Sequence, residues 1–366
     1  MSHYDLIVVG AGIVGASCAD EATAAGLRVA IVEPGPIGGG ATACGMGHLV
    51  AMDDDPAELA LARYSLRRWE DHADLAEAEF SRCGTLWVAR NETEAAGIAQ
   101  RVARLEASGG EAEAVDAQAL YRLEPALAPG LCGGMLAPRE AVVYPPRVAL
   151  HLVRRARQRG ASLYAGRAVR RLGRATVTLD DGTVLAGPTL VATGCALPEL
   201  LPQLPLRPRK GHLLITDRYP GLLHHQVLEL GYASSAHGTA GSSVAFNVQP
   251  RPTGQILIGS SREFDVTDPA VSGPMLQRML QRAFDFMPAL RGLRAIRAWT
   301  GFRPTTPDGR PYLGAVPDST DLWVAAGHEG LGVTTALGSA RLMLDLLQGR
   351  PPAIDPAPYA PARALA

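Results

Sequence analysis

Residues 4–33 read YDLIVVGAGIVGASCADEATAAGLRVAIVE, which divides into an apolar run, a glycine-rich turn, a helix-like segment and a second apolar run. This pattern predicts strand, tight turn, helix and strand, and it matches the fingerprint of a dinucleotide-binding fold. Gly10 permits the turn, Gly12 lets a pyrophosphate approach the backbone, and Gly15 lets the helix pack closely on the strand. The helix begins near Ile13, where its free amides and positive dipole end favour phosphate.

Glu33 stands at the end of the second strand, 18 residues after Gly15. A carboxylate at this position can accept hydrogen bonds from the two hydroxyls of an adenosine ribose. It would also repel a 2′-phosphate, so NADP is disfavoured. These residues predict that the chain binds NAD or FAD, and by themselves they leave the choice between the two open.

The composition describes a large chain with balanced charge. Its 366 residues and 38.5 kDa suffice for a large core and for two domains. The 36 acidic and 35 basic residues give a formal net charge of -1, which predicts neither a nucleic-acid groove nor a surface for anionic membranes. The first residues lack the pattern of a signal peptide, and no apolar run reaches membrane-spanning length. We therefore expect a cytoplasmic protein without a membrane span.

The cysteines support neither a disulfide framework nor a metal site. They are odd in number and contain no CxxC pair. All five are scattered along the chain, at Cys18, Cys44, Cys83, Cys132 and Cys195. Reduced thiols agree with the expected cytoplasmic location, and no metal ligand set is predicted.

The chain leaves the nucleotide-binding segment through a run of small residues and returns to the same sheet twice. Residues 34–48 are rich in glycine and alanine, so their backbone can run flush against a flat ligand. Buried strands are expected at 188–194 and 321–327, and both end on glycine. The Pro/Ala-rich tail from Pro351 is expected to be loosely ordered.

This order of segments predicts an α/β protein with two domains. The first is a discontinuous Rossmann-like nucleotide-binding domain, formed by residues 1–80, 141–205 and 305–366. The second is an inserted α+β substrate domain with a mostly antiparallel sheet, formed by residues 81–140 and 206–304.

Several short motifs resemble the two-domain FAD-dependent amino-acid oxidase family, which includes glycine oxidase, sarcosine oxidase, D-amino-acid oxidases and their dehydrogenase relatives. They are VATG at 191–194, WVAAGH at 323–328, GTLWV at 84–88, VVYPPR at 142–147, GQILIG at 254–259 and GFRPTTPDG at 301–309. The resemblance extends over about residues 4–349. It implies that the nucleotide is FAD, because a plain nicotinamide dehydrogenase does not need the late strand and helix.

The resemblance also implies where the cofactor lies. Glycines and amides at 327–335 open a helix, where negative charge on the reduced flavin would be stabilised. Val169 and Gly194 match backbone near the adenine and pyrophosphate, and Met46 and His48 match residues that line the isoalloxazine ring. No covalent-flavin cysteine is evident, so non-covalent FAD is expected. The expected cofactor-binding residues are Gly10, Gly12, Ile13, Val14, Gly15, Glu33, Pro34, Thr42, Gly45, Met46, Val169, Thr193, Gly194, Gly301, Gly327, His328, Glu329, Gly330, Leu331, Gly332, Val333 and Thr334.

Three residues are candidates for the reaction, in which a hydride passes from the carbon bearing nitrogen to flavin N5. Arg303 resembles the arginine that binds the substrate carboxylate in glycine oxidase-like enzymes, and a bidentate guanidinium suits a carboxylate. A structural ion pair is the alternative role for Arg303. Tyr232 is a candidate second contact to the substrate, and His48 is a candidate catalytic residue. A loop position without such a role for Tyr232, and a packing role for His48, are the alternatives.

Two motifs depart from the oxidase pattern. RKGH at 209–212 and EGLG at 329–332 resemble the flavin subunits of D-hydroxyproline dehydrogenase, L-proline dehydrogenase and hydrogen cyanide synthase. The resemblance implies a hetero-oligomer in which partner subunits with iron–sulfur or flavin groups carry the electrons away. D-hydroxyproline or D-proline is then the expected substrate, with a glycine-like amino acid next. The alternatives are a stand-alone oxidase that releases peroxide and a non-catalytic FAD-binding subunit.

Overall fold

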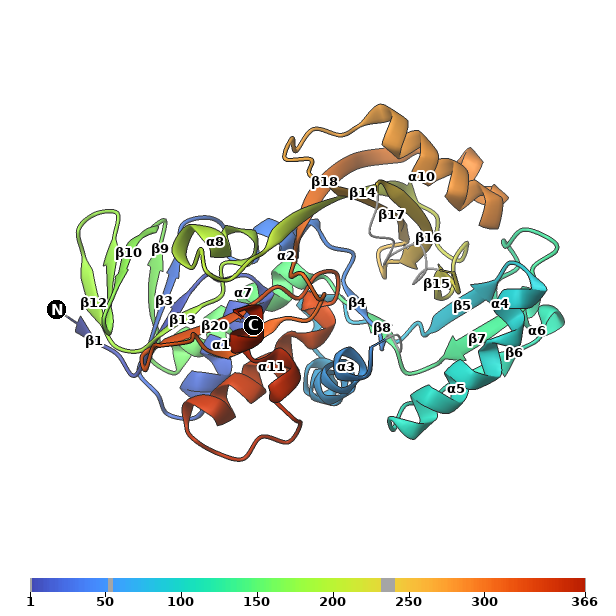
Figure 1. Ribbon diagram of the computed structural model, residues 1–366. Coiled ribbons are helices and arrows are strands. Elements are labelled where there is room, and N and C mark those ends of the chain that lie inside the picture. The colour runs from blue at the N-terminus through green and yellow to red at the C-terminus, as the bar shows by residue number, and fades with distance from the viewer. Residues whose placement is uncertain (1, 52–54, 232–240, 366) are drawn as a thin grey trace.

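A computed structural model describes residues 2–51, 55–231 and 241–365, and its two large sheets lie in separate parts of the molecule (Figure 1). One sheet has six strands and contains the glycine-rich turn. The other has eight strands and is built from two insertions in the chain. This architecture confirms the expected α/β fold with a Rossmann-like part and a second, mostly antiparallel part.

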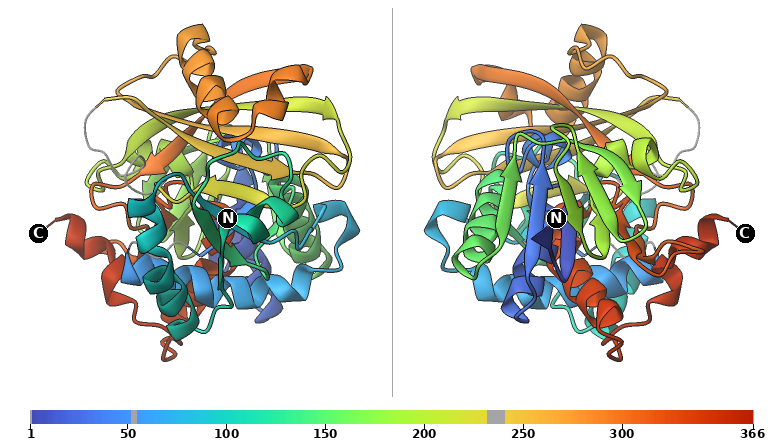
Figure 2. Two further views of the ribbon diagram at one scale, coloured as in Figure 1. Left: turned by 90° about the vertical axis from the view of Figure 1, so that its right-hand side faces the viewer. Right: turned by 90° about the vertical axis from the view of Figure 1, so that its left-hand side faces the viewer.

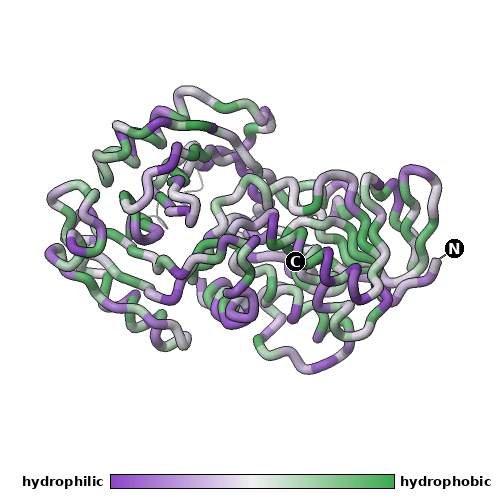
Figure 3. Tube along the Cα trace, turned by 180° about the vertical axis from the view of Figure 1, so that it is seen from behind, coloured by the Kyte–Doolittle hydropathy of each residue, from purple (hydrophilic) through white to green (hydrophobic). Residues whose placement is uncertain are grey.

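The six-stranded sheet is parallel apart from one edge strand. Its order is β19 (Tyr312–Ala315), β20 (Leu322–Ala326), β13 (Thr189–Val191), β2 (Leu6–Val9), β3 (Val29–Glu33) and β9 (Ser162–Ala165), and β19 runs antiparallel to β20. Parallel strands are covered on both faces and therefore read as continuous apolar runs. The apolar runs that predicted strands at 188–194 and 321–327 contain two of these parallel strands, β13 and β20. Figure 3 shows hydrophobic residues following these strands through the interior.

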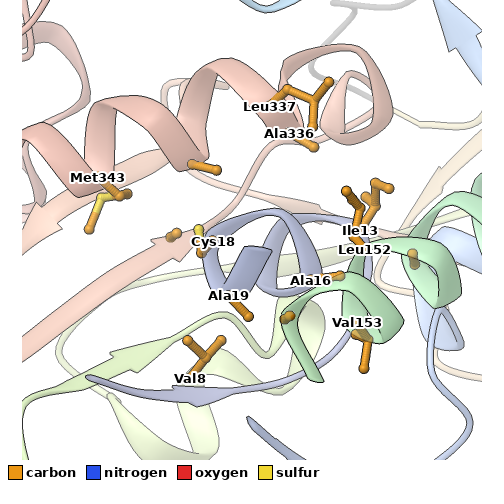
Figure 4. Close-up of a cluster of buried hydrophobic side chains, with 14 of the residues drawn as sticks. Val8, Ile13, Ala16, Cys18, Ala19, Leu152, Val153, Ala336, Leu337 and Met343 are labelled. Carbon is orange, nitrogen blue, oxygen red and sulfur yellow. The ribbon is translucent and has the colours of Figure 1, made fainter. Parts of the chain in front are cut away.

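Helices cover one face of this sheet. Helix α1 (Ile13–Ala24) packs between α11 (Gly332–Leu347) and α7 (Pro145–Gln158), and α11 also packs on α3 (Pro56–Trp69). The contact face of α1 is made of small residues, which let the neighbouring helices approach closely. Figure 4 shows Ala16 and Ala19 of α1 beside Leu152 and Val153 of α7. This packing fixes the position of the α1 N-terminus at the glycine-rich turn.

A small sheet covers the other face. It has the order β1 (Ser2–His3), β12 (Val184–Ala186), β11 (Thr176–Leu179) and β10 (Val169–Gly173). Val177, Leu179 and Leu185 of this sheet pack against Ile7 and Val9 of β2. The result is a three-layer arrangement that buries the central strands on both sides.

The eight-stranded sheet carries the second part of the molecule. Its order is β18 (Ala295–Thr305), β14 (Arg207–Arg218), β17 (Gln255–Phe264), β16 (Ser243–Pro250), β15 (Gln226–Glu229), β5 (Thr85–Ala89), β7 (Gly133–Ala137) and β6 (Glu113–Val115). Only the β15–β5 pair is parallel among these neighbours. Helix α10 (Gly273–Phe286) covers the outer face (Figure 2). Phe286 of this helix stacks on Phe246 of β16.

The remaining elements are short. They include α2 (Gly40–Cys44), α4 (Glu92–Ala96), α5 (Ile98–Ala107), α6 (Ala117–Leu123), α8 (Leu197–Leu200), the two-stranded sheet of β4 (His48–Leu49) and β8 (Ala141–Val142), and short 3₁₀ helices. No helix in the described part of the chain is long and apolar enough to cross a membrane.

The prediction of a loosely ordered C-terminal tail was wrong. Residues 357–364 form two turns of 3₁₀ helix that dock on the body of the molecule. Tyr359 is 1% exposed and its hydroxyl donates to the carbonyl of Ala57, while Arg363 binds the carboxylate of Asp308. Composition alone did not indicate these two long side chains as anchors.

Candidate active site

The glycine-rich turn leaves no room for side chains. Gly10 has φ of 103°, and a Cβ built on it would lie 2.5 Å from the carbonyl oxygen of Ala192, at the end of β13. A Cβ on Gly15 would lie 2.0 Å from the carbonyl oxygen of Gly10. Gly12 caps α1 in an extended conformation without a side-chain cap. The turn therefore brings the backbone of β2, α1 and β13 together at the start of α1, where the first amides have no partner within the helix.

The carboxylate of Glu33 lies beside this turn. Its Oε2 accepts from the amide of Ala11 at 2.7 Å, and its Oε1 accepts from the amide of Gly35 at 2.8 Å. A carboxylate offers about four acceptor positions, so both oxygens can also accept from ribose hydroxyls. At the neighbouring strand end, the buried Thr193 Oγ1 has no hydrogen-bond partner among the described residues. These features fit the adenosine and pyrophosphate half of a dinucleotide.

The segment after β20 reaches the second large sheet. The amide of Glu329 donates to the carbonyl of Pro304 in β18 at 3.0 Å. Helix α11 then begins at Gly332 without a side-chain cap on its N-terminus. The uncapped amides of a 16-residue helix are suited to stabilise negative charge. The beginning of α11 is therefore available to the ring end of the cofactor.

Two of the predicted cofactor residues use their side chains within the protein. His328 Nε2 lies 3.1 Å from Ser339 Oγ, and burial lowers the pKa of His328 to about 4. Thr334 Oγ1 donates to the carbonyl of His48 at 2.9 Å and accepts from the amide of Val50. Thr334 therefore fastens β4 to α11, which holds His48 in place.

Three further predicted residues mark the contact between the two large sheets. Thr42 Oγ1 accepts from the amide of Ile13 at 3.0 Å. Met46 packs against Leu213 of the eight-stranded sheet, and its carbonyl accepts from Gln249. A Cβ on Gly301 would lie 2.3 Å from Cys44 Cβ, so this glycine lets α2 pack on β18.

The predicted residues not described so far lie on the same elements. Val14 belongs to α1, Val169 begins β10, and Val333 belongs to the first turn of α11. Pro34 directly follows β3, Gly45 ends α2, and Gly194 follows β13 with φ of 56°. Gly327, with φ of 85°, directly follows β20. Tyr232 lies outside the described residues.

A cavity of about 970 Å³ opens where the segment after β20, the strand β4 and the eight-stranded sheet meet. His48, Glu329, Gly330 and Leu331 line it, so four of the predicted residues are brought together there. Arg209, Arg262 and Phe264 line it from β14 and β17. Arg209 and Arg262 were not among the residues expected to take part in the reaction.

Arg303 lies next to this cavity, although it is not one of the residues that line it. Its Nη1 donates to the carbonyl of Ser261 at 3.1 Å, and its Nε lies 4.0 Å from Glu329 Oε1. A Cβ on Gly211 would lie 2.5 Å from Arg303 Nη1, so the guanidinium passes directly over Gly211. Arg303 thus forms an ion pair with Glu329, which is the structural role expected as its alternative. Because Glu329 lines the cavity, Arg303 lies beside a carboxylate of the cavity wall.

Glu329 is surrounded by arginines. Its Oε1 lies 3.4 Å from Arg209 Nη1, and Arg209 is stacked on Phe264 with 4.5 Å between guanidinium carbon and ring centre. Burial raises the pKa of Glu329, but the positive charges of Arg303, Arg262 and Arg209 outweigh this effect and lower it overall. Glu329 therefore stays ionised. Its φ of 47° is in the left-handed region, which few residues other than glycine adopt without cost.

His48 presents a neutral ring to the cavity. Burial, together with the nearby charge of Arg303, lowers its pKa to about 3. Its Nε2 is buried and has no hydrogen-bond partner among the described residues. A neutral imidazole next to a cationic cluster can accept or donate one hydrogen bond at this nitrogen, depending on its tautomer.

The fold and this site together define a flavin-dependent oxidoreductase. The family model described as "DAO: FAD dependent oxidoreductase" matches residues 5–346, and the chain belongs to this family. This confirms the predicted family, the FAD cofactor and the enzymatic class.

Relatives match over almost their whole length. Glycine oxidase of Pseudomonas aeruginosa (strain PAO1) is 32% identical and aligns over 98% of both chains. Hydrogen cyanide synthase subunit HcnC of the same organism is 28% identical over 98% of this chain and 96% of its own. The crystal structure of L-proline dehydrogenase from P. horikoshii superposes with a TM-score of 0.90 over 99% of this chain and 98% of that chain, at 20% identity. That last similarity shows the fold alone.

Proposed function

We propose that this enzyme oxidises the C–N bond of a small amino or imino acid. The observation that carries the proposal is the cavity itself, where Glu329 and its arginines meet the neutral ring of His48 beside the uncapped start of α11. Relatives that act on amino acids, glycine oxidase among them, support the same substrate class. FAD, when bound, supplies the hydride-accepting chemistry.

The chain's own residues would orient the substrate. In this proposal Arg303 binds the substrate carboxylate, since a guanidinium offers two parallel N–H donors to it. His48 Nε2 accepts a hydrogen bond from the substrate amine, which must be neutral when the adjacent carbon gives up its hydride. The nearby positive charge favours the neutral amine, because like charge lowers the pKa of an ammonium group. Tyr232 remains proposed as a second contact to the substrate.

The predicted cofactor set also remains a proposal. Gly10, Gly12, Gly15 and Glu33 would hold the adenosine and pyrophosphate half without a covalent bond. The first amides of α11 would face the pyrimidine edge of the ring system and stabilise negative charge there. The steric fit at the glycine turn and the buried Thr193 Oγ1 support this placement.

We also propose the domain division that the sequence predicted, with residues 81–140 and 206–304 as the substrate domain. Strand membership supports it, since β5 to β7 and β14 to β18 all belong to the eight-stranded sheet. The cavity would then lie between the two domains, which is a common place for ligand sites.

The electron acceptor that we propose is a partner subunit, as the EGLG motif at 329–332 suggests by its resemblance to multi-subunit dehydrogenases. The similarity to hydrogen cyanide synthase subunit HcnC supports this proposal. D-hydroxyproline or D-proline is the substrate that this resemblance favours. A stand-alone oxidase that releases peroxide is the second candidate, which the similarity to glycine oxidase supports.

An anaerobic titration of the purified, FAD-loaded protein tests these proposals. The panel consists of glycine, sarcosine, L- and D-proline and cis-4-hydroxy-D-proline, followed by admission of air. Bleaching of the flavin absorbance with slow reoxidation supports a dehydrogenase that needs a partner. Bleaching with rapid reoxidation and peroxide supports the oxidase. If no amino or imino acid bleaches the flavin, including the acidic amino acids considered below, the proposed function is wrong.

A further inference from the structure

Four of the described arginines line the cavity, Arg207, Arg209, Arg262 and Arg310, and of these only Arg209 and Arg262 are buried. Arg209 and Arg262 line it from β14 and β17, which are neighbours in the eight-stranded sheet. Only 5% of Arg209 and 4% of Arg262 is exposed. A guanidinium group loses much of its hydration when it is buried, so such positions are used where an anion compensates the charge.

The protein contributes one carboxylate to the centre of this group. Glu329 lies 3.4 Å from Arg209 and 4.0 Å from Arg303. The positive charge of Arg262 also lowers the pKa of Glu329. Three other acidic residues along the cavity are held by arginines outside this group. Asp55 binds Arg310, Asp265 binds Arg207 and Asp308 binds Arg363.

The guanidinium groups are fixed in an arrangement that can hold two carboxylates. Arg209 and Arg303 are directly opposed on β14 and β18, where Cα atoms of antiparallel strands lie about 5 Å apart. Arg209 is held by Phe264 and Glu329, while Arg303 is held by the carbonyl of Ser261. Two anchors this close suit the two carboxylates of a short amino dicarboxylic acid.

We propose that the substrate is an amino or imino acid with a second carboxylate, which Arg209 and Arg262 bind while Arg303 binds the carboxylate next to the amine. This inference rests on the proposed function, and it replaces the expected proline-like side chain with an acidic one. The class includes aspartate-like and glutamate-like amino acids and N-carboxymethyl amino acids. Arg209 and Arg262 are then specificity-determining residues.

The test compares acids with their uncharged counterparts on the FAD-loaded enzyme. Anaerobic flavin reduction is measured with both enantiomers of aspartate and glutamate, with the enantiomers of asparagine and glutamine, and with iminodiacetate, glycine and cis-4-hydroxy-D-proline. We expect an acid to reduce the flavin at least tenfold more efficiently than its amide. In the Arg262→Met variant the efficiency of flavin reduction should fall at least tenfold with the acid and less than threefold with the amide.

Two further variants keep the test decisive. Arg262→Lys retains the charge and should recover part of the preference for the acid. This variant also tests the assignment if Arg262→Met does not fold. Arg207→Met removes a positive charge from the exposed rim of the same cavity, where Arg207 is paired with Asp265, and it should leave the preference unchanged. Loss of preference in Arg207→Met would show a general charge effect and overturn the assignment.

The outcomes separate this inference from the proposed function. If glycine or cis-4-hydroxy-D-proline reduces the flavin and no dicarboxylic acid does, the inference is wrong and the proposed function stands. If Arg262→Met slows the acid and the amide equally, Arg262 belongs to the general carboxylate site and the inference is also wrong. If no compound of either panel reduces the flavin, the proposed function itself fails.

Discussion

Arg303 combines a structural ion pair with a position beside the cavity. Its guanidinium donates to Ser261 and lies 4.0 Å from Glu329. Replacement of Arg303 by leucine should leave FAD bound and lower kcat/KM by about 100-fold, since loss of a charged hydrogen-bonded partner costs about 3 kcal/mol. Flavin absorbance per protein measures cofactor retention, and anaerobic reduction measures turnover. Unchanged kinetics in this variant would leave Arg303 with a structural role alone.

His48 should act without changing its charge. With a pKa of about 3 it remains neutral throughout the range in which the enzyme can be assayed. The kcat/KM of a His48→Asn variant should therefore fall by about tenfold at every pH, with the shape of the pH profile unchanged. The measurement is the rate of anaerobic reduction from pH 5.5 to 9. If the pH profile of the unmodified enzyme changes near pH 6.5 and this change is absent in the variant, His48 gains a proton there and the prediction of a neutral His48 is wrong.

Glu140 is a buried carboxyl outside the proposed active site. It lines a second cavity of about 260 Å³, and its Oε1 accepts from the amide of Ala51 at 2.7 Å. Burial raises its pKa to about 7. A raised carboxyl pKa gives stability that is complete below pH 4.5 and is lost as pH rises through 7.

A Glu140→Gln variant keeps an acceptor for Ala51 and removes the titration. It should raise the free energy of unfolding at pH 8 by roughly 3 kcal/mol at most, and by far less at pH 5. Glu111→Gln, which changes an exposed glutamate in the same cavity, should have little effect at either pH. Chemical denaturation at the two pH values measures the difference. Equal effects of Glu140→Gln at pH 5 and pH 8 would show that Glu140 does not titrate in this range.

At the scale of elements, the contact of β2, α1 and β13 depends on glycine. A Cβ at position 15 would lie 2.0 Å from the carbonyl oxygen of Gly10, which the rigid turn cannot move away. We expect Gly15→Ala to destabilise the protein by about 3 kcal/mol and to lose FAD. Gly273→Ala at the start of α10 meets no atom within 4 Å and should be neutral. Melting temperature and flavin content measure both variants.

Elements with a strong local pattern could be predicted, because the burial of an element determines which residue types it contains. The continuous apolar runs at 6–9 and 29–32 gave the parallel strands, and the glycines between them gave the turn. The pattern of residues 92–108 predicts one helix, but the structure has two, because Gly97 ends α4 and α5 begins at Ile98. Helix propensity over the whole segment did not reveal an interruption at one glycine.

The arginine cluster could not be predicted in the same way, because it depends on the order of strands in the sheet. Arg209 and Arg262 are 53 positions apart in the sequence, and they line the same cavity because β14 pairs with β17. One local signal was present. A charged residue inside a strand that is otherwise buried is uncommon and indicates a site. His48 and Glu329 were expected near the cofactor from the family resemblance, and both line the cavity, while their roles stay predictions.

At the scale of the whole molecule, buried neutral histidines should govern stability in acid. Burial lowers the pKa of His72 and of His328 to about 4 each, and that of His48 to about 3. These groups take up protons near pH 6.5 only when the chain unfolds. The unfolded state therefore binds more protons below this pH, and the free energy of unfolding falls as pH falls.

The free energy of unfolding should fall by about 1.4 kcal/mol per pH unit for each histidine as the pH is lowered from 6 to the folded pKa of about 4. Denaturant unfolding of the FAD-saturated protein at pH 7, 6 and 5 measures it. A His328→Gln variant keeps a hydrogen bond to Ser339 and cannot take up a proton, so its stability should decline less steeply from pH 7 to pH 5. A His3→Gln variant changes an exposed histidine and should follow the unmodified protein. Parallel pH dependence of His328→Gln and the unmodified protein would show that His328 is protonated in the folded state, and that its burial does not limit the acid stability of the enzyme.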